Sequence, residues 1–382
     1  MGERFTVDVG PVAHGGHCVA RLPEPDSRVV FVRHALPGER VVVEITEGTE
    51  TDRYWRADAV SVESRSSPDR VAAPCPVAGP GLCGGCDFQH VDLSAQRGLK
   101  ADVVREQLVR LGRLDLDHPV VARVVVEAVP GDEGGLRWRT RVRYATAPDG
   151  RRGMRRHRSH DVVPVLDCLI TRTDALEPGS GPVTEVVETA AGTRTFSVPA
   201  DGFWQVHPGA PRVLVETVLD FLGPRPGERV LDLYAGVGLF ARFLADAVGP
   251  SGEVVAVEGD EAACQHARSN LGDVEVTWGR VDAVLATAYD ELWDLVVLDP
   301  PREGAKRAVV EQVVARAPRA VAYVACDPAA LARDVATFAE HGYTLERLRA
   351  LDLFPMTHHV ECVALLNRTG PDSRERELGE WR

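Results

Sequence analysis

A cysteine and a carboxylate near the C-terminus could together perform nucleophilic catalysis. Cys326 follows the apolar run 321–325 and precedes Asp327-Pro328, so we expect it where a strand meets the N-terminus of a helix. A helix N-terminus favours the thiolate, which is the reactive form of cysteine. Glu361 opens a later apolar strand, where burial raises the pKa of a carboxyl group toward values useful for proton abstraction. The alternatives are a buried, inert thiol and a glutamate that pairs with an arginine such as Arg333.

A glycine turn farther upstream could hold a nucleotide-like cofactor. The predicted strand 229–233 runs into Tyr234-Ala235-Gly236-Val237-Gly238, and glycine lets a ligand approach the backbone at such a junction. Glu258, about 20 positions after Gly238, ends the next predicted strand and could hold ribose hydroxyls. The pattern fits a nicotinamide dinucleotide as well as S-adenosylmethionine. The alternative without a ligand is a glycine that lets the strand and helix pack tightly.

A proline-stiffened loop distinguishes between these two cofactors. The predicted strand 295–298 ends in Asp299-Pro300-Pro301-Arg302, at the sheet edge where α/β folds bind ligands. Such a loop is unusual in dehydrogenases and common in methyltransferases that act on nitrogen or carbon of planar rings. We therefore predict S-adenosylmethionine as the cofactor, with Asp299 facing the cofactor and substrate. Asp299 could also cap the following helix.

Four of the eight cysteines are spaced like the ligands of a metal site. Cys75, Cys83 and Cys86 lie in one loop that contains proline and glycine, and Cys168 comes from a later β-rich segment. The N-terminal residues show no signal peptide, so we expect a reducing cytoplasm, where clustered thiols bind metal. Zinc and an iron-sulfur cluster both accept four thiolates, and spacing alone does not choose between them. We expect three further cysteines to be simply packed in the core: Cys18, Cys264 and Cys362.

An arginine-rich segment suggests a surface for RNA. Residues 137–158 contain nine arginines and one acid, Asp149. We expect the first four arginines to share one face of a hairpin and to bind phosphates. These are Arg137, Arg139, Arg141 and Arg143. Trp138, Tyr144 and His157 could stack on unpaired bases. The alternative is a solvated charged face.

Length and composition limit the class of protein. The chain has 382 residues, enough for two or three domains, and a formal net charge of −13. This charge argues against a generally basic nucleic-acid coat and against binding to anionic membranes, while a local basic site remains open. No apolar run is long enough to cross a bilayer. We expect a soluble, cytoplasmic protein with no membrane partner and no obligatory protein partner.

The hydrophobic pattern predicts the elements that position these residues. Residues 4–64 alternate between apolar and polar positions, which predicts a small β-barrel. An amphipathic helix is expected from about residue 92 to Gly112. From residue 228 buried strands alternate with helices, which predicts a parallel, doubly wound sheet. Its expected strands are 229–233, 254–257, 274–277, 295–298 and 320–325. Two more strands, 345–351 and 360–366, are expected to pair antiparallel.

The order of these motifs resembles the S-adenosylmethionine-dependent RNA uracil-5 methyltransferases that carry an N-terminal TRAM barrel. The resemblance covers about residues 4–366. It rests on Cys75, Cys83-Gly84-Gly85-Cys86, Cys168, Phe203-Trp204-Gln205, residues 232–238, Asp299-Pro300-Pro301-Arg302, Cys326-Asp327-Pro328 and residues 354–361. It implies an OB-like TRAM barrel (1–66), a middle α+β RNA-binding domain with an iron-sulfur site (67–200) and a Rossmann-like class I methyltransferase domain (201–370). A polar tail (371–382) follows.

The resemblance also implies a mechanism and its residues. Cys326 would add to carbon 6 of a uridine, and Glu361 would remove the proton from carbon 5 after methylation. The implied S-adenosylmethionine residues are Gln205, Tyr234, Gly236, Gly238, Glu258, Asp282 and Asp299. The four clustered cysteines would hold a [4Fe-4S] cluster that stabilises the middle domain, because the reaction requires no redox step. The implied partner is RNA, with ribosomal RNA (23S) favoured over transfer RNA.

Two positions depart from the family pattern. Asp327 stands where many members have asparagine, and its carboxylate opposes thiolate formation at Cys326 unless Asp327 turns away to cap the helix. Leu239 stands where some members present an amide. Three alternative functions remain: a transfer RNA uridine-5 methyltransferase, an exocyclic-amine methyltransferase that needs no cysteine, and a non-catalytic RNA-binding module.

Overall fold

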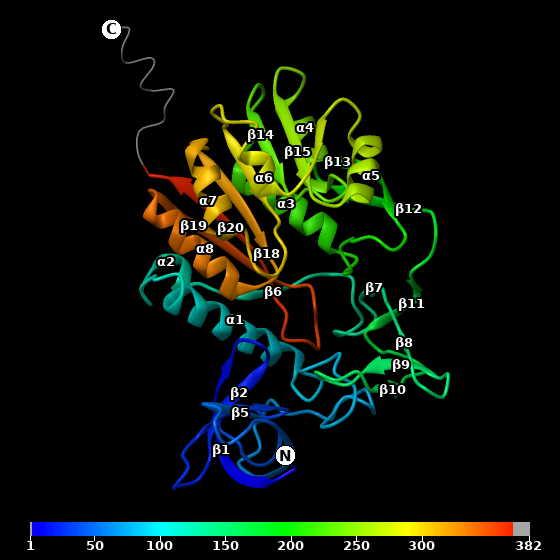
Figure 1. Ribbon diagram of the computed structural model, residues 1–382, viewed down its shortest axis with the longest axis vertical. Coiled ribbons are helices and arrows are strands. Elements are labelled where there is room, and N and C mark those ends of the chain that lie inside the picture. The colour runs from blue at the N-terminus through cyan, green and yellow to red at the C-terminus, as the bar shows by residue number, and fades with distance from the viewer. Residues whose placement is uncertain (1, 370–382) are drawn as a thin grey trace. The chain divides into compact units, whose positions relative to one another are not determined.

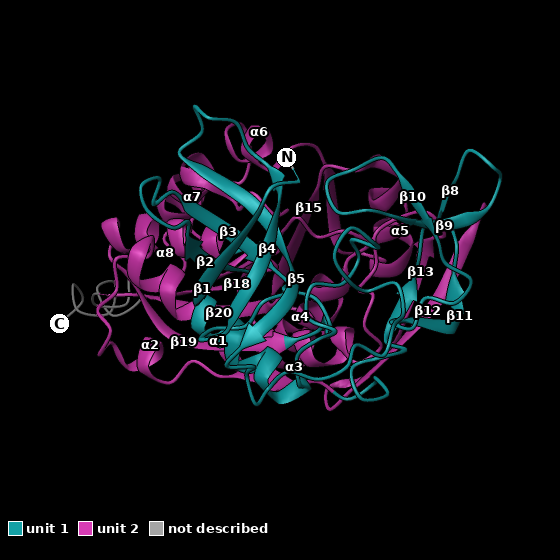
Figure 2. Ribbon diagram, turned by 90° about the horizontal axis from the view of Figure 1, so that it is seen from below, with its two compact units in different colours: residues 1–103, 130–177, 352–359 teal, residues 104–129, 178–351, 360–382 magenta. Residues whose placement is uncertain are grey.

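The computed structural model describes residues 2–369, which form two compact units (Figure 1). Of the described residues, unit 1 comprises 2–103, Pro130–Glu177 and Asp352–His359, and unit 2 comprises Val104–Val129, Pro178–Leu351 and 360–369 (Figure 2). The predicted tail, 371–382, lies outside the described residues. The predicted boundaries at residues 66 and 200 stay a prediction. In the described part of the chain, no helix is long and apolar enough to cross a membrane.

Unit 1 begins with a closed five-stranded barrel, as the alternating sequence pattern predicts. Its strands are β1 (Arg4–Ala13), β2 (His17–Arg21), β3 (Val29–Arg33), β4 (Arg40–Glu47) and β5 (Tyr54–Ser64), and they close in the order β1-β2-β3-β5-β4. Alternate valines, among them Val30, Val32, Val41 and Val43, are fully buried inside. Closure leaves no free sheet edge.

The arginine-rich segment forms only a short hairpin and not the long one predicted. A turn at residues 148–150 does join two paired strands, as expected, but the strand before it is interrupted. Before the turn lie β7 (Arg139–Arg141) and β8 (Ala145–Thr146). After it come β9 (Arg152–Arg155), β10 (Val162–Pro164) and β11 (Thr171–Leu176). β7 pairs with β11, whereas β8 pairs with β9. Arg137 has a φ of 53°, which takes it out of extended backbone. The first four arginines therefore do not share one strand face.

Two predicted roles in this segment are wrong as well. Trp138 is 2% exposed and packs edge-on against Phe354, with ring centroids 5.9 Å apart, so it cannot stack on a base. Arg137 donates hydrogen bonds to the Asp167 carboxylate and to the carbonyl of Thr171. It therefore holds the loop that carries Cys168.

Unit 2 is built on an eight-stranded sheet with the order β16-β15-β14-β17-β18-β20-β19-β6. Five neighbouring strands are parallel, as the sequence pattern predicts, and β20 runs antiparallel to both β18 and β19. The strands are β14 (Arg229–Leu233), β15 (Glu253–Glu258), β16 (Glu275–Trp278), β17 (Leu295–Leu298), β18 (Ala320–Ala325), β19 (Tyr343–Asp352), β20 (Glu361–Arg368) and β6 (Val126–Ala128). The sequence pattern does not predict β6, which joins the far edge from an early part of the chain.

Helices follow the parallel strands as a doubly wound sheet requires (Figure 1). They are α4 (Leu239–Val248), α5 (Glu261–Leu271), α6 (Val281–Leu285), α7 (Lys306–Ala315) and α8 (Pro328–Glu340), whereas α3 (Ala210–Leu222) precedes β14. The other elements are α1 (Leu93–Arg110), α2 (Pro119–Ala122) and the hairpin β12 (Pro182–Thr189) and β13 (Gly192–Pro199). α1 confirms the predicted helix but not its predicted amphipathic pattern, because Gln96, Lys100 and Gln107 lie on its buried face. α3 packs against α4, and α7 packs against α8. β17 is buried along its whole length, so the sheet centre forms the core.

We expect Leu231→Ala to lower the free energy of unfolding of unit 2 by about 2–5 kcal/mol, because Leu231 is fully buried on a strand with neighbours on both sides. Leu292→Ala, at a side chain that is 59% exposed, is the matched control and should change it by less than about 0.5 kcal/mol. Urea unfolding followed by circular dichroism measures both. Equal losses for the two variants would contradict the assigned sheet core.

Candidate active site

The register of the parallel strands brings the predicted site residues to one sheet edge. Leu233 pairs with Val257 on one side and with Leu298 on the other, and Leu298 pairs with Tyr323. The carboxyl ends of β14, β15, β17 and β18 therefore lie in one row. The residues that end or follow these strands are Tyr234, Glu258, Asp299 and Cys326.

The glycine turn after β14 positions the carboxylate of Glu258. The backbone N–H of Gly236 donates to one oxygen of Glu258 at 2.7 Å, and the N–H of Asp260 donates to the other at 2.8 Å. Gly238 has a φ of 91°, and a Cβ there would lie 2.8 Å from the Leu271 side chain, so only glycine fits. Each carboxylate oxygen keeps a second lone pair that can accept from ribose hydroxyls.

Buried acids surround this turn. Asp232 is fully buried within β14 and accepts a hydrogen bond from the N–H of Ala241 at 2.8 Å. Burial, with the charge of Glu258, raises the pKa of Asp232 to about 7. Burial, with the charges of Asp232 and Glu258, likewise raises the pKa of Asp299 to about 7. A site with three neighbouring carboxyl groups favours a positively charged ligand, and S-adenosylmethionine carries a sulfonium and an ammonium group.

Cys326 lies between β18 and α8, as predicted. Asp327 turns to cap α8, because its carboxylate accepts from the N–H of Ala330 at 2.8 Å. The thiol nevertheless does not ionise easily. Burial and the charges of Glu361 and Asp299 raise the pKa of Cys326 to about 12, and the nearby Arg302 guanidinium opposes this rise. The isolated protein therefore holds Cys326 as a thiol at neutral pH.

Glu361 begins the strand beside the nucleophile. β20 pairs antiparallel with β18, and Cys362 is the partner of Ala325, so the next step of this register brings Glu361 beside Cys326. Glu361 is 4% exposed, and burial together with Asp299 raises its pKa well above the usual range. Between residues 2 and 369 Glu361 forms no ion pair, so the alternative pairing with Arg333 is not found. The carboxyl group is available for proton transfer.

Of the remaining predicted cofactor residues, Asp282 has an electrostatic contact with the site, whereas Gln205 has no hydrogen bond or ion pair to it among the described residues. Asp282 lies in α6, where it pairs with Arg280 at 2.7 Å, and its charge helps to raise the pKa of Tyr234 to about 12 after the larger effect of burial. Asp282 and Tyr234 are therefore electrostatic neighbours. Gln205 is 9% exposed and lies in the segment before α3. Among the described residues no hydrogen bond or ion pair joins Gln205 to the other site residues.

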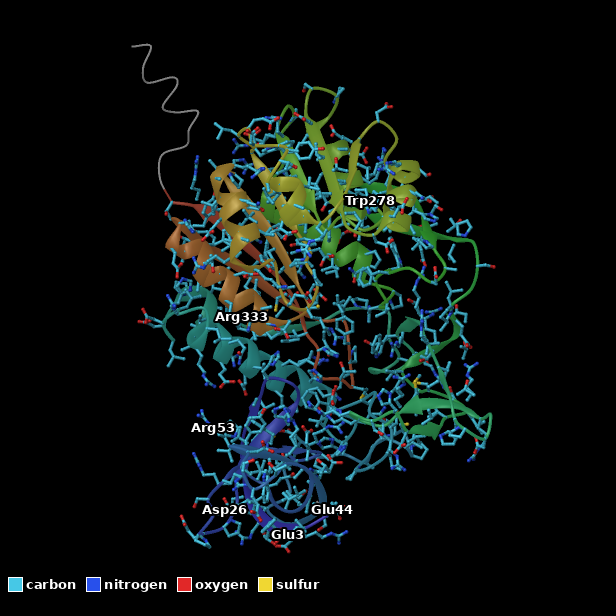
Figure 3. The ribbon with its side chains drawn as sticks, viewed as in Figure 1. Glu3, Asp26, Glu44, Arg53, Trp278 and Arg333 are labelled. Atoms are coloured by element: carbon cyan, nitrogen blue, oxygen red, sulfur yellow. The ribbon has the colours of Figure 1, made fainter. Side chains whose placement is uncertain are left out.

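The sequence reasoning missed two residues at this edge. Asp232 stands inside an apolar strand, and the reasoning applied to Glu361, that a carboxylate there needs a function, would have identified it. Trp278 ends β16 with 55% of its surface exposed, and its indole N–H donates to the Gly259 carbonyl at 3.1 Å (Figure 3). An exposed, fixed ring beside Glu258 offers a face on which a planar base can stack.

The four predicted metal ligands lie together in unit 1. Cys75, Cys83, Cys86 and Cys168 all line one cavity. The N–H of Gly85 donates to the Cys83 sulfur at 3.4 Å, and the Gln89 amide donates to the Cys86 sulfur at 3.3 Å. The other end of the Gln89 side chain accepts from the backbone N–H of Cys75 at 2.9 Å. Within residues 2–369, no three His, Cys, Asp or Glu side chains form a group that could hold a metal ion.

Comparison with protein families agrees with this architecture. The TRAM domain model matches residues 1–69, the methyltransferase small domain model matches residues 209–323, and the tRNA (uracil-5-)-methyltransferase model matches residues 278–369. Among solved structures, a Pyrococcus abyssi tRNA (uracil-54, C5)-methyltransferase in complex with S-adenosyl-L-homocysteine has the same fold, with a TM-score of 0.68 and 21% identity. The match covers 94% of this chain and 99% of that one.

Two curated relatives cover nearly the whole chain. An uncharacterised RNA methyltransferase of Streptomyces avermitilis is 46% identical, with 96% of this chain and 98% of the relative covered. The 23S rRNA (uracil(1939)-C(5))-methyltransferase RlmD of Halomonas elongata is 32% identical, with 99% and 92% covered. The fold and site thus define an S-adenosylmethionine-dependent RNA methyltransferase. The chain belongs to the RNA uracil-5 methyltransferase family with an N-terminal TRAM domain.

Alkylation of Cys326 by iodoacetamide should speed up steadily from pH 7 to pH 10, because the raised pKa leaves little thiolate at neutral pH. Arg302→Gln removes a charge that lowers this pKa, so we expect alkylation about fivefold slower, as for a change of about 1 kcal/mol. Arg333→Gln, at an exposed arginine on α8 (Figure 3), is the control and should leave the rate unchanged. Peptide mass spectrometry resolves Cys326 from the other cysteines. A rate that levels off below pH 8 would contradict the electrostatic description.

Proposed function

We propose that this enzyme methylates carbon 5 of a uridine in 23S ribosomal RNA through a covalent bond between Cys326 and carbon 6. The observation that carries the proposal is the register of β18 and β20, which brings a cysteine and a buried glutamate side by side at the cofactor edge. Carbon 5 of uracil is a poor nucleophile, and addition of a thiolate at carbon 6 turns it into the nucleophilic carbon of an enolate.

The residues divide the reaction between them. Cys326 first loses its proton to solvent, the resulting thiolate sulfur bonds to carbon 6, and the electrons of the carbon 5–carbon 6 double bond move onto the uracil ring as an enolate. When bound, S-adenosylmethionine would supply the methyl group for carbon 5, with S-adenosylhomocysteine as the product. Glu361, as a carboxylate, takes the proton from carbon 5, the double bond reforms, and the Cys326 thiolate leaves. The atoms and charges balance without a further reactant.

Electrostatics links the cofactor to the nucleophile in this proposal. In the protein alone, Asp299 and Glu361 raise the pKa of Cys326 and so oppose its ionisation. A sulfonium charge at the same edge would offset those carboxyl charges and favour both the thiolate and the ionised acids. Cysteine addition would then follow cofactor binding rather than precede it.

The choice of RNA rests on similarity over the full chain. RlmD of Halomonas elongata, named for 23S rRNA, matches 99% of this chain at 32% identity, whereas the Pyrococcus abyssi tRNA enzyme matches 94% at 21% identity. Exposed arginines of the segment 137–158 provide phosphate contacts in unit 1. They are Arg143, Arg151, Arg152, Arg155, Arg156 and Arg158. Transfer RNA is the second candidate, favoured by the tRNA (uracil-5-)-methyltransferase model that matches residues 278–369.

We also propose that the four cysteines hold a [4Fe-4S] cluster. Their thiols line a shared cavity with N–H donors to two sulfurs, and such donors stabilise cluster thiolates. Four thiolates around one zinc ion would lie about 3.8 Å apart, from a Zn–S distance of about 2.3 Å. The four cysteines line a cavity, and in the described residues no three of them are grouped closely enough to hold a single metal ion, which favours a cluster over one zinc ion. The cluster would crosslink the loop before α1 to the loop before β11.

The covalent step can be trapped. Fluorine at carbon 5 cannot be removed as a proton, so wild type with S-adenosylmethionine and 5-fluorouridine-substituted RNA should form a stable complex through Cys326. Cys326→Ala should form none, and the control Cys264→Ala, at a buried thiol of α5, should trap RNA as wild type does. Denaturing gels and peptide mass spectrometry detect the complex, and sequencing of the attached fragment identifies the RNA.

Failure of the trap has a clear meaning. No complex with wild type, when bound S-adenosylmethionine is demonstrated, would contradict the covalent mechanism and favour amine methylation or RNA binding alone. Complexes formed only with transfer RNA would contradict the ribosomal substrate and leave the chemistry intact.

Removal of one cluster ligand should empty the cysteine site. Cys168→Ser, purified without oxygen, is expected to lose most of its iron and acid-labile sulfide and to melt about 5 °C lower, because metal binding contributes to folding free energy. Cys18→Ser, at a buried thiol of the barrel, should keep the wild-type iron content. Elemental analysis and calorimetry measure the two effects. Zinc without sulfide in the wild type would contradict the cluster.

A further inference from the structure

The segment Asp352–His359 connects β19 to β20 and ends two residues before Glu361. By its contacts it belongs to unit 1, although the strands that it joins belong to the sheet of unit 2. Connections between strands are normally exposed and mobile. This one is held at both ends and in its middle by side chains of unit 1.

Asp87 holds the second half of the segment. Its carboxylate accepts from the ring nitrogen Nδ1 of His358 at 2.6 Å and from the backbone N–H of His358 at 3.2 Å. The backbone N–H groups of Asp87 and Phe88 both donate to the carbonyl of Met356 at 3.0 Å. Asp87 directly follows Cys86. The loop that carries three of the clustered thiols is therefore also the loop that binds this segment.

Helix α1 holds the rest. The side-chain amide oxygen of Gln96 accepts a hydrogen bond from the backbone N–H of Met356 at 2.8 Å. Lys100 is completely buried, and its ammonium group donates to Asp352 at 2.6 Å and to the carbonyl of Phe354 at 3.0 Å. Replacing either Lys100 or Asp352 with an uncharged residue would leave the other charge buried and unpaired. The ion pair therefore fixes the position of Asp352, where the segment starts.

The backbone of Met356 shows that the conformation is imposed. Its φ is 66°, a left-handed conformation that a long side chain rarely adopts and that costs about 1–3 kcal/mol. Both its N–H and its carbonyl are occupied by unit 1, through Gln96 on one side and through Asp87 and Phe88 on the other. Gly16 contacts the same segment, because a Cβ at Gly16 would lie 2.4 Å from the Cβ of His358.

We propose that Asp87 and Gln96 are positioning residues for Glu361, and that the step they control is removal of the carbon 5 proton. This inference rests on the proposed function. A carboxylate that takes a proton from carbon must be held within a fraction of an ångström of its productive place. The segment sets the position of the chain two residues before Glu361, while Cys326 is carried by α8 and β18. Loosening the segment therefore impairs proton removal and leaves cysteine addition and methyl transfer intact.

Asp87→Asn tests the inference on RNA with ordinary uridine and S-adenosylmethionine labelled in the methyl group. We expect kcat to fall by about 100-fold with KM for RNA unchanged, since small misplacement of a catalytic group costs about that much. The methylated protein–RNA complex, which is short-lived in wild type, should accumulate on denaturing gels. Trapping with 5-fluorouridine RNA should be as fast as in wild type, because that reaction stops before proton removal.

Glu39→Gln is the matched control: Glu39 is a buried carboxylate of the same unit that binds Arg70 and makes no contact with the segment among the described residues. It should behave as wild type. Gln96→Leu provides a second route if Asp87→Asn does not fold, and should also accumulate the methylated complex. A fall in kcat without accumulation, or equal slowing of the 5-fluorouridine trap, would overturn the positioning role. Failure of wild type to trap 5-fluorouridine RNA would instead overturn the proposed function.

Discussion

The crowding of buried and half-buried carboxyl groups at one edge of the sheet is the constraint on which the active site depends. Asp232, Glu258 and Asp299 lie close enough that their charges oppose one another, and Asp299 in turn opposes ionisation of Glu361 and Cys326. Such an arrangement destabilises the empty protein at neutral pH, because each ionised acid raises the free energy of the others. A cofactor with a fixed positive charge relieves the repulsion. In the proposed mechanism, the same acids would favour a positively charged cofactor and oppose ionisation of the cysteine until that cofactor is bound.

The fold keeps these groups in place by backbone contacts. Parallel register aligns the strand ends, the glycine turn donates to Glu258, and Asp327 caps α8 just beyond the nucleophile. A second anchor lies behind the edge: the Tyr323 hydroxyl and the N–H of Ala305 both donate to the Asp334 carboxylate, at 2.6 and 2.8 Å. These bonds tie the end of the proline loop to α8.

Local patterns in the sequence were sufficient for most of this architecture. The alternation of apolar residues predicted the barrel, and the buried runs after residue 228 predicted five parallel strands and the antiparallel end of the sheet. Motifs at strand ends were placed correctly, because parallel strands bring their carboxyl ends together whatever the helices between them do. The four cysteines were also grouped correctly from their spacing, because Cys75, Cys83, Cys86 and Cys168 line one cavity.

Non-local pairing explains the predictions that failed. Alternating arginines suggested one long strand, but β7 pairs with β11 and β8 with β9. In addition, Arg137 has a left-handed backbone conformation and does not continue the strand. Trp138 was assigned to RNA although the Phe354 loop, more than two hundred residues downstream, covers it. β6 is too short to show a pattern of its own.

The central claim is that the enzyme replaces the hydrogen on carbon 5 of a uridine with a methyl group. Release of tritium from RNA labelled at carbon 5 of uridine, counted alongside methyl transfer, tests it most directly. The account requires one tritium released to water for each methyl group transferred, and methyl transfer without tritium release would contradict it.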